Sequence, residues 1–358
     1  MRFNFKTRYD QDIALARHGG HRFWYSLLML ALLAAPWVMS EYWLAQLTFV
    51  FIYAIVAFGL MLLCGFTGQF SIGHAAFMGI GAYTEAFLAS RGWPLPVSLA
   101  CSMALAAAAG VVVGLPALRV KGMYLAIATL SFGFIVEEVL ARWESVTGGN
   151  AGRSVPAPQL FGLALDGAAS FYLLCLACMT GATLVVLNLL RSPTGRAFVA
   201  IRDSEVSAQS MGIQLARYKS LSFAISAALA GLGGALYGHK MQFISPDQFS
   251  LVQSIDLMLM VVIGGLGSVH GAFFGAIFLI GMPQLISLGK DFLPAAIGQA
   301  TGLQGVIYGA VLIAFVMLEP MGMYGRWLKV RTWLELYPFY RRGMFRRQKS
   351  FQKSERLK

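Results

Sequence analysis

The chain has 358 residues, of which 58% are hydrophobic and 12% charged, and its formal net charge is +12. A soluble domain carries about 25% charged residues, so this composition excludes an ordinary soluble protein and predicts an all-α, polytopic integral membrane protein. Excess Lys and Arg is typical of cytoplasmic loops in membrane proteins, and we therefore expect no nucleic acid partner.

Ten long apolar segments follow one another along the chain. In the first half they cover residues 23–39, 43–64, 72–90, 96–118 and 122–140, and in the second half residues 169–190, 220–238, 254–267, 272–288 and 302–318. A helix needs about 20 residues to cross the hydrocarbon core of a bilayer. We therefore predict about ten transmembrane helices in a membrane domain at residues 23–318, between an N-terminal segment (1–22) and a basic tail (319–358).

The distribution of Lys and Arg supports this topology. Residues 1–22 hold five of them, residues 119–121 two, residues 191–219 five and residues 319–358 eleven, so that 23 of the 28 fall in segments that ten spans place on one side. Because Lys and Arg concentrate in short cytoplasmic segments, we predict that both termini and the loop at residues 191–219 are cytoplasmic.

A polar, glycine-rich stretch interrupts the apolar pattern at residues 65–74, between the second and third predicted spans. Irregular backbone at membrane depth is tolerated only where it is buried in protein or lines a cavity. One interpretation is a substrate pathway that includes Gln69, Ser71, Gly73 and His74. The other is a tight cytoplasmic turn followed by a closely packed helix.

Glu85 is the one acidic residue that the predicted spans place well inside the membrane. Ionisable side chains at this depth are rare, and they often belong to transport pathways. Glu85 is therefore a candidate pathway residue, and the alternative is an acid that caps a local polar network.

A second glycine-rich cluster, with Gly264, Gly265 and Gly267, follows the eighth predicted span. The sequence Ser-Ile-x-x-Ala-x-Phe at residues 71–77 is similar to Ser-Val-x-x-Ala-x-Phe at residues 268–274. Interrupted segments at corresponding places in a transporter point to the substrate site. We therefore add these three glycines to the candidate pathway.

The loop at residues 191–219 has helix signals but too few apolar residues for a core of its own. Asp203 or Ser204 can cap a helix whose first turn contains Glu205, and Gly212 can end it. Ala197, Phe198 and Ile201 form an apolar stripe, which predicts docking on a partner subunit; a plain connector is the alternative. The candidate docking residues are Arg196, Phe198, Ile201, Arg202, Asp203, Glu205, Met211 and Gly212.

The tail beyond residue 318 combines aromatic residues with a basic run that contains Arg341, Arg342, Arg346, Arg347 and Lys349. Such a run suits an anionic lipid surface. A basic tail without a dedicated partner and a contact with an ATP-binding subunit remain as alternatives.

Several kinds of chemistry have no sequence signal in this chain. No Gly-x-x-x-x-Gly-Lys-Ser/Thr loop is present, so the chain is not expected to bind ATP in the P-loop manner. Cys64, Cys101, Cys175 and Cys178 lie in apolar runs without a cluster of His or acidic residues near them. We expect no catalytic residues, no metal site and no cofactor.

Four stretches resemble a known family: residues 65–83 (GFTGQFSIGHAAFMGIGAY), residues 147–152 (TGGNAG), residues 195–213 (GRAFVAIRD through MGI) and residues 260–268 (MVVIGGLGS). Over about residues 45–325 the chain is similar to the permease subunits, of the LivM type, of bacterial ABC importers of the branched-chain amino-acid class. Residues 195–212 then resemble the coupling segment that rests on an ATP-binding subunit.

The resemblance implies a multi-pass protein of the bacterial inner membrane and a set of partners. These are a second permease subunit of the LivH type, two ATP-binding subunits, a periplasmic solute-binding protein, membrane lipid and an amino-acid substrate. Relatives that carry urea, short amides or carboxylates leave the substrate open. An ion-coupled secondary transporter or a channel for a small polar solute is the alternative function.

Overall fold

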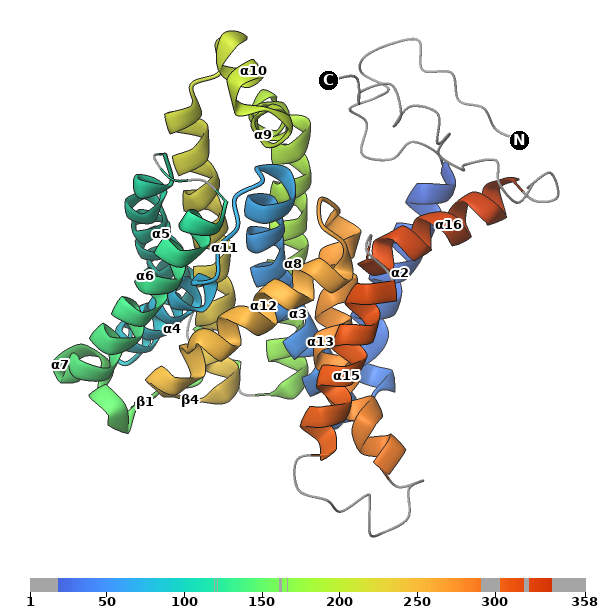
Figure 1. Cartoon of the computed structure of the whole chain (residues 1–358). Coiled ribbons are helices and arrows are strands. Elements are labelled where there is room, and N and C mark those ends of the chain that lie inside the picture. Colours follow the sequence, from blue (N-terminus) through green and yellow to red (C-terminus); the bar gives the residue numbers. More distant parts are fainter. Residues whose placement is uncertain are drawn as a thin grey trace, which may run out of the picture.

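A computed structural model describes residues 19–118, 120, 122–160, 163–165, 167–290, 303–318 and 322–336. These residues form a bundle of α-helices (Figure 1). Residues 1–18, the basic positions Arg119 and Lys121, and the basic run after residue 336 lie outside the described residues. The predicted all-α membrane fold is confirmed.

Seven helices among the described residues are long and apolar enough to cross a membrane. They are α3 with the π-helical turn η1 (Glu41–Met61 and Leu62–Phe66), α5 (Leu95–Gly114), α6 (Met123–Arg142), α8 (Ala168–Arg191), α11 (Leu215–Met241), α12 with the preceding turn η4 (Leu251–Gly264 and Pro246–Phe249) and α13 (Val269–Lys290). The other three predicted spans correspond to α2 (Gly19–Val38) and α15 (Leu303–Leu318), which contain shorter apolar stretches, and to α4 (His74–Ala89), which has only 16 residues. The count of ten spans therefore stays a prediction.

Helix α11 lies at the centre of the bundle, where it packs against α3, α4 and α5. Small residues allow these helices to approach closely, as in other membrane proteins. A Cβ atom on Gly81 of α4, for example, would lie 2.6 Å from the carbonyl carbon of Gly231 of α11. The buried core is thus built around α11, and the third predicted span, α4, is largely enclosed by its neighbours.

One end of the bundle carries short elements that the sequence did not predict. They include α7 (Glu144–Thr147), the 3-10 turn η3 (Gly149–Ala151), the strand β1 (Arg153–Ser154) paired antiparallel with β4 (Phe243–Ile244), and the hairpin of β2 (Gln159–Leu160) and β3 (Leu163–Ala164). Strands of two residues are too short to show an alternating pattern. Figure 1 shows β1 and β4 at the end of the bundle opposite α9 and α10.

The opposite end carries α9 (Pro193–Asp203) and α10 (Glu205–Ser210), and a further turn, η2 (Pro116–Leu118), follows α5. Helix α16 (Gly322–Leu336) lies within the predicted basic tail and was not expected as a helix. It packs against α12 and α13. At its first residue, a Cβ atom on Gly322 would lie 2.7 Å from the Cα atom of Gly265, so α16 begins directly against the second glycine-rich cluster.

Candidate functional site

The first glycine-rich stretch is a buried break between α3 and α4. The widened turn η1 ends α3, and residues 67–73 then run irregularly to the start of α4. Two backbone N–H groups at this break donate to side chains from other helices: Ile72 N to Thr129 Oγ1 (3.0 Å) and Ala75 N to Ser254 Oγ (3.1 Å). These bonds replace helical ones, which lets irregular backbone exist inside the protein.

The predicted pathway residues Gln69, Ser71 and His74 are all buried at this break, with at most 4% of each exposed. Gln69 Nε2 donates to Ser222 Oγ (2.9 Å) of α11, and His74 Nε2 lies 3.2 Å from Ser226 Oγ of the same helix. Neither serine could be identified from the sequence, because serine is common in membrane helices and nothing in the sequence pairs Ser222 or Ser226 with the break.

The two glycine-rich clusters, 200 residues apart in sequence, meet in the structure. A Cβ atom on Gly65 would lie 2.9 Å from the Cα atom of Gly267. Gly267 has a φ of 78°, which favours glycine. Arg202 of α9 donates from Nη1 to the carbonyl oxygen of Gly65 (3.1 Å), so the coupling segment touches the point where the two clusters join.

The two similar sequence patterns do not begin their helices at the same position. Helix α4 begins three residues after Ser71, whereas α13 begins one residue after Ser268. Ser268 Oγ accepts a hydrogen bond from the N–H of Gly271 (2.9 Å) and so caps α13. Ser71 Oγ has no hydrogen-bond partner.

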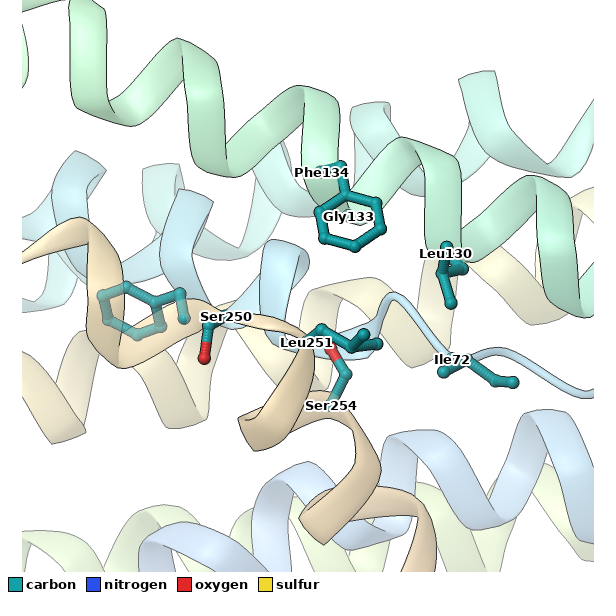
Figure 2. A pocket seen from close by; sticks show the side chains of 8 residues that line it. Ile72, Leu130, Gly133, Phe134, Ser250, Leu251 and Ser254 are labelled. Carbon is teal, nitrogen blue, oxygen red and sulfur yellow. The ribbon is translucent and has the colours of Figure 1, made fainter.

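A small pocket opens beside the first break, between α6 and the start of α12 (Figure 2). Its lining consists of Ile72, Leu130, Gly133, Phe134, Phe249, Ser250, Leu251 and Ser254. It has room for about one water molecule and cannot hold an amino acid. A substrate pathway along the break stays a prediction, and it would require the surrounding helices to move apart.

Glu85 belongs to a buried polar cluster eleven residues along α4 from His74. Its carboxylate accepts hydrogen bonds from Ser98 Oγ (2.6 Å) and Ser102 Oγ (3.3 Å) of α5, and lies 3.0 Å from His239 Nε2 of α11. The other ring nitrogen of His239 lies 3.0 Å from the carbonyl oxygen of Pro156. Glu85 thus joins three helices and an end loop, as the local-network interpretation expects, and a pathway role for it stays a prediction.

The predicted docking segment at residues 195–212 contains two helices, α9 and α10, instead of the single predicted one. Ser192 caps α9 by accepting from the N–H of Gly195 (3.4 Å), and Ser204 caps α10 by accepting from the N–H of Ser207 (3.3 Å). Of the two predicted caps, Ser204 is therefore correct, because Asp203 is the last residue of α9. Gly212 follows α10 with a φ of 84°, as expected of a residue that ends a helix.

The apolar stripe of α9 faces this chain and not a partner, which corrects the expectation from the sequence. Phe198 and Ile201 are 0% and 2% exposed, and the Phe198 ring packs edge-on against Tyr218 of α11 (6.3 Å between centroids). These side chains therefore anchor α9. The exposed apolar residues here are Val206 and Met211, at 77% and 82%.

Comparison with known proteins matches residues 42–316, most of the chain, to the permease component of branched-chain amino acid transport systems. The chain belongs to this family. It is 33% identical over 323 residues to the high-affinity branched-chain amino acid transport system permease protein LivM of Escherichia coli K12, a match that covers 83% of this permease and 73% of LivM.

Two further relatives carry related names. LivM of Salmonella typhimurium is 32% identical with the same coverage, and LivH of E. coli K12 is 26% identical over 295 residues, covering 76% of this permease and 91% of LivH. No solved structure matches. The predicted family is confirmed, and the comparisons do not support an ion-coupled transporter or a channel.

Two buried ionisable residues of the permease, Lys219 and His239, were missed in the sequence. Lys219 Nζ lies 2.6 Å from Glu205 Oε1, with 3% of the lysine side chain exposed, and ties the start of α10 to α11. His239 lies twenty positions after Lys219 on α11. At a rise of 1.5 Å per residue, the two residues are about 30 Å apart, which is close to the thickness of the hydrocarbon core. Ionisable residues within an apolar helix are the signal that could have identified both.

Within the described ranges, no group of three His, Cys, Asp or Glu side chains is close enough to hold a metal ion. All four cysteines are free thiols that are buried or half-buried.

Proposed function

We propose that this permease is the transmembrane subunit of an ATP-driven ABC importer that moves branched-chain or related amino acids from the periplasm to the cytoplasm. It pairs with a second permease of the LivH type, two ATP-binding subunits and a periplasmic solute-binding protein in a bacterial inner membrane. The observation that carries this proposal is the family match over residues 42–316, supported by relatives named for both LivM and LivH.

The surface for an ATP-binding subunit is the exposed side of α9, α10 and the turn after them. Val206 and Met211 provide apolar contact area there, beside exposed Arg196, Asp203 and Gly212. Arg202 connects this surface to Gly65 at the junction of the two glycine-rich clusters. Movement imposed on α9 by ATP binding would therefore reach the break through Arg202, which bonds to Gly65 and lies against Gly68.

Aspartate at both Val206 and Met211 should reduce the amount of ATP-binding subunit that co-purifies with the permease by about tenfold or more, because a charge replaces an apolar contact. The measurement is co-purification from membranes. Trp93→Asp is the control, since Trp93 is also an exposed apolar residue, at 49%, but lies in the turn between α4 and α5, outside the membrane-crossing helices. Normal association of the double variant would exclude this surface as the docking site.

Phe198→Ala should behave differently from the surface variants. It removes a fully buried ring and should destabilise the permease by about 3–5 kcal/mol. Thermal unfolding of the purified complex measures this loss. A stable Phe198→Ala variant would contradict the anchoring role.

Ten spans with cytoplasmic termini place α10 and the end loop after α7 on opposite sides of the membrane. Single cysteines at exposed Gln209 and exposed Asn150, in a variant without the four native cysteines, should react with an impermeant maleimide from opposite sides. Labelling of both positions from the same side would contradict this topology.

A further inference from the structure

Unpaired polar atoms gather at the first break. Six buried side-chain oxygen or nitrogen atoms among the described residues have no hydrogen-bond partner, and three of them, Gln69 Oε1, Ser71 Oγ and His74 Nδ1, lie within six residues of each other in sequence. Each such atom costs about 1–3 kcal/mol, so a group of them in one segment requires an explanation.

The surrounding hydroxyl groups determine what these atoms can do. The Ser222 hydroxyl donates its proton to the carbonyl oxygen of Lys219 (2.7 Å), so it can only accept a hydrogen bond from Gln69. The Gln69 amide must therefore direct its Nε2 group toward Ser222, which leaves Oε1 without a partner. Ser226 donates its proton to the carbonyl oxygen of Gly59 (2.6 Å), so His74 Nε2 must be the donor toward it. His74 Nδ1 is then a bare acceptor.

Ser71 contrasts with its counterpart in the second cluster. Ser268 uses its hydroxyl to cap α13, whereas Ser71 Oγ caps nothing and remains able to accept. Gln69 Oε1 and His74 Nδ1 can only accept, and the Ser71 hydroxyl can accept as well because neither its lone pairs nor its O–H has a partner. Their chemical complement is a group with several N–H donors and no acceptor, which is the description of an ammonium group.

We propose that Gln69 Oε1, Ser71 Oγ and His74 Nδ1 bind the α-ammonium group of the substrate amino acid. This assignment rests on the proposed function and adds to it the substrate group that the break recognises. Irregular backbone within a membrane protein is tolerated where it is buried or lines a cavity, so this broken segment can border the path of the substrate.

The site is closed in this structure. Thr129 of α6 and Ser254 of α12 hold the backbone of the break through hydrogen bonds to Ile72 N and Ala75 N, and the pocket between these two helices has room for about one water molecule. Gln69, Ser71 and His74 are themselves at most 4% exposed, so the helices around the break must separate before a substrate can reach them.

Ser71→Ala gives the sharpest test, because the hydroxyl that it removes has no partner in the protein. The measurement is equilibrium binding of labelled L-leucine and of its 2-hydroxy analogue, which lacks the ammonium group, to the complete permease and ATPase complex in lipid nanodiscs. Ser71→Ala should weaken leucine binding by about tenfold or more and binding of the analogue by less than about threefold. Its thermal unfolding temperature should not fall.

Ser131→Ala is the matched control, since the hydroxyl of Ser131 bonds only to its own helix at the carbonyl of Ile127. Unchanged leucine binding by Ser71→Ala, or equal weakening for both ligands, would overturn the ammonium site. Absence of leucine binding in a complex that still transports leucine would do the same. A wild-type complex that, with its binding protein and ATP, fails to transport leucine overturns the proposed function itself.

Discussion

Gly73→Ala should reduce transport to less than about a tenth of the wild-type rate. A Cβ atom on Gly73 would lie 2.8 Å from the carbonyl carbon of Thr129, and closer still to its oxygen. This neighbour is backbone of α6 and cannot turn aside, so α6 must shift, at a cost of about 3 kcal/mol. The shift would also disturb the hydrogen bond between Thr129 Oγ1 and Ile72 N. Initial uptake rates and thermal unfolding of the complex measure both effects.

Gly133→Ala is the matched control for this contact. It lies on the α6 side of the same contact, but its Cβ atom would be 3.4 Å from the Cα atom of Gly73, which is an ordinary contact distance. We expect it to retain most transport. Equal effects of the two variants, or normal transport by Gly73→Ala, would show that the break does not depend on this packing. A larger residue such as leucine at position 73 could not distinguish a blocked pathway from disturbed packing, because its Cβ atom alone would already collide with the backbone of Thr129.

Glu205→Gln should release α10 from α11 and greatly reduce coupling between the ATP-binding subunits and transport. It leaves the ammonium of Lys219, with 3% of its side chain exposed, without its carboxylate partner. The Glu205 side chain is 22% exposed, so we expect a loss at or below the lower end of the about 3–5 kcal/mol that breaking a fully buried ion pair costs, which is still about tenfold or more in the equilibrium between docked and released α10. Hydrogen exchange of α10 and the uptake rate measure these changes.

Three further variants distinguish the loss of the Lys219–Glu205 ion pair from a general effect of removing a charge. Lys219→Met removes the buried charge and should be milder than Glu205→Gln, and the double variant should recover part of the lost stability. Glu138→Gln breaks an exposed pair with Arg142 and should change stability by less than about 1 kcal/mol. A double variant as unstable as the sum of the two single variants would contradict direct coupling between Lys219 and Glu205.

Much of the fold could be predicted from sequence because a membrane imposes a simple length rule. Each of the ten apolar segments corresponds to a helix, since backbone in the bilayer core must bond within its own segment. The division of residues 193–210 into α9 and α10 was missed because Ser192, a good cap, lies directly after the apolar run of α8. Helix α16 was missed because its residues are neither apolar nor regularly patterned.

The site could be predicted only as separate pieces. Glycine and polar residues between two spans identify the break at residues 65–74, but sequence separation hides its contact with Gly267 and with Arg202. The apolar stripe with Phe198 correctly signals burial, yet a stripe does not say which surface covers it, and here the covering surface is the chain's own α11. The partners of Glu85 on α5 and α11 could not be identified without the helix packing.

The most direct test of the proposed function is uptake of labelled leucine by proteoliposomes. They contain this permease, a LivH-type permease and both ATP-binding subunits, with the loaded solute-binding protein outside and ATP inside. We predict that leucine accumulates only when ATP and all of these subunits are present, and that the permease alone takes up none under a proton or sodium gradient. Gradient-driven accumulation by the permease alone, without ATP, would contradict the proposed function.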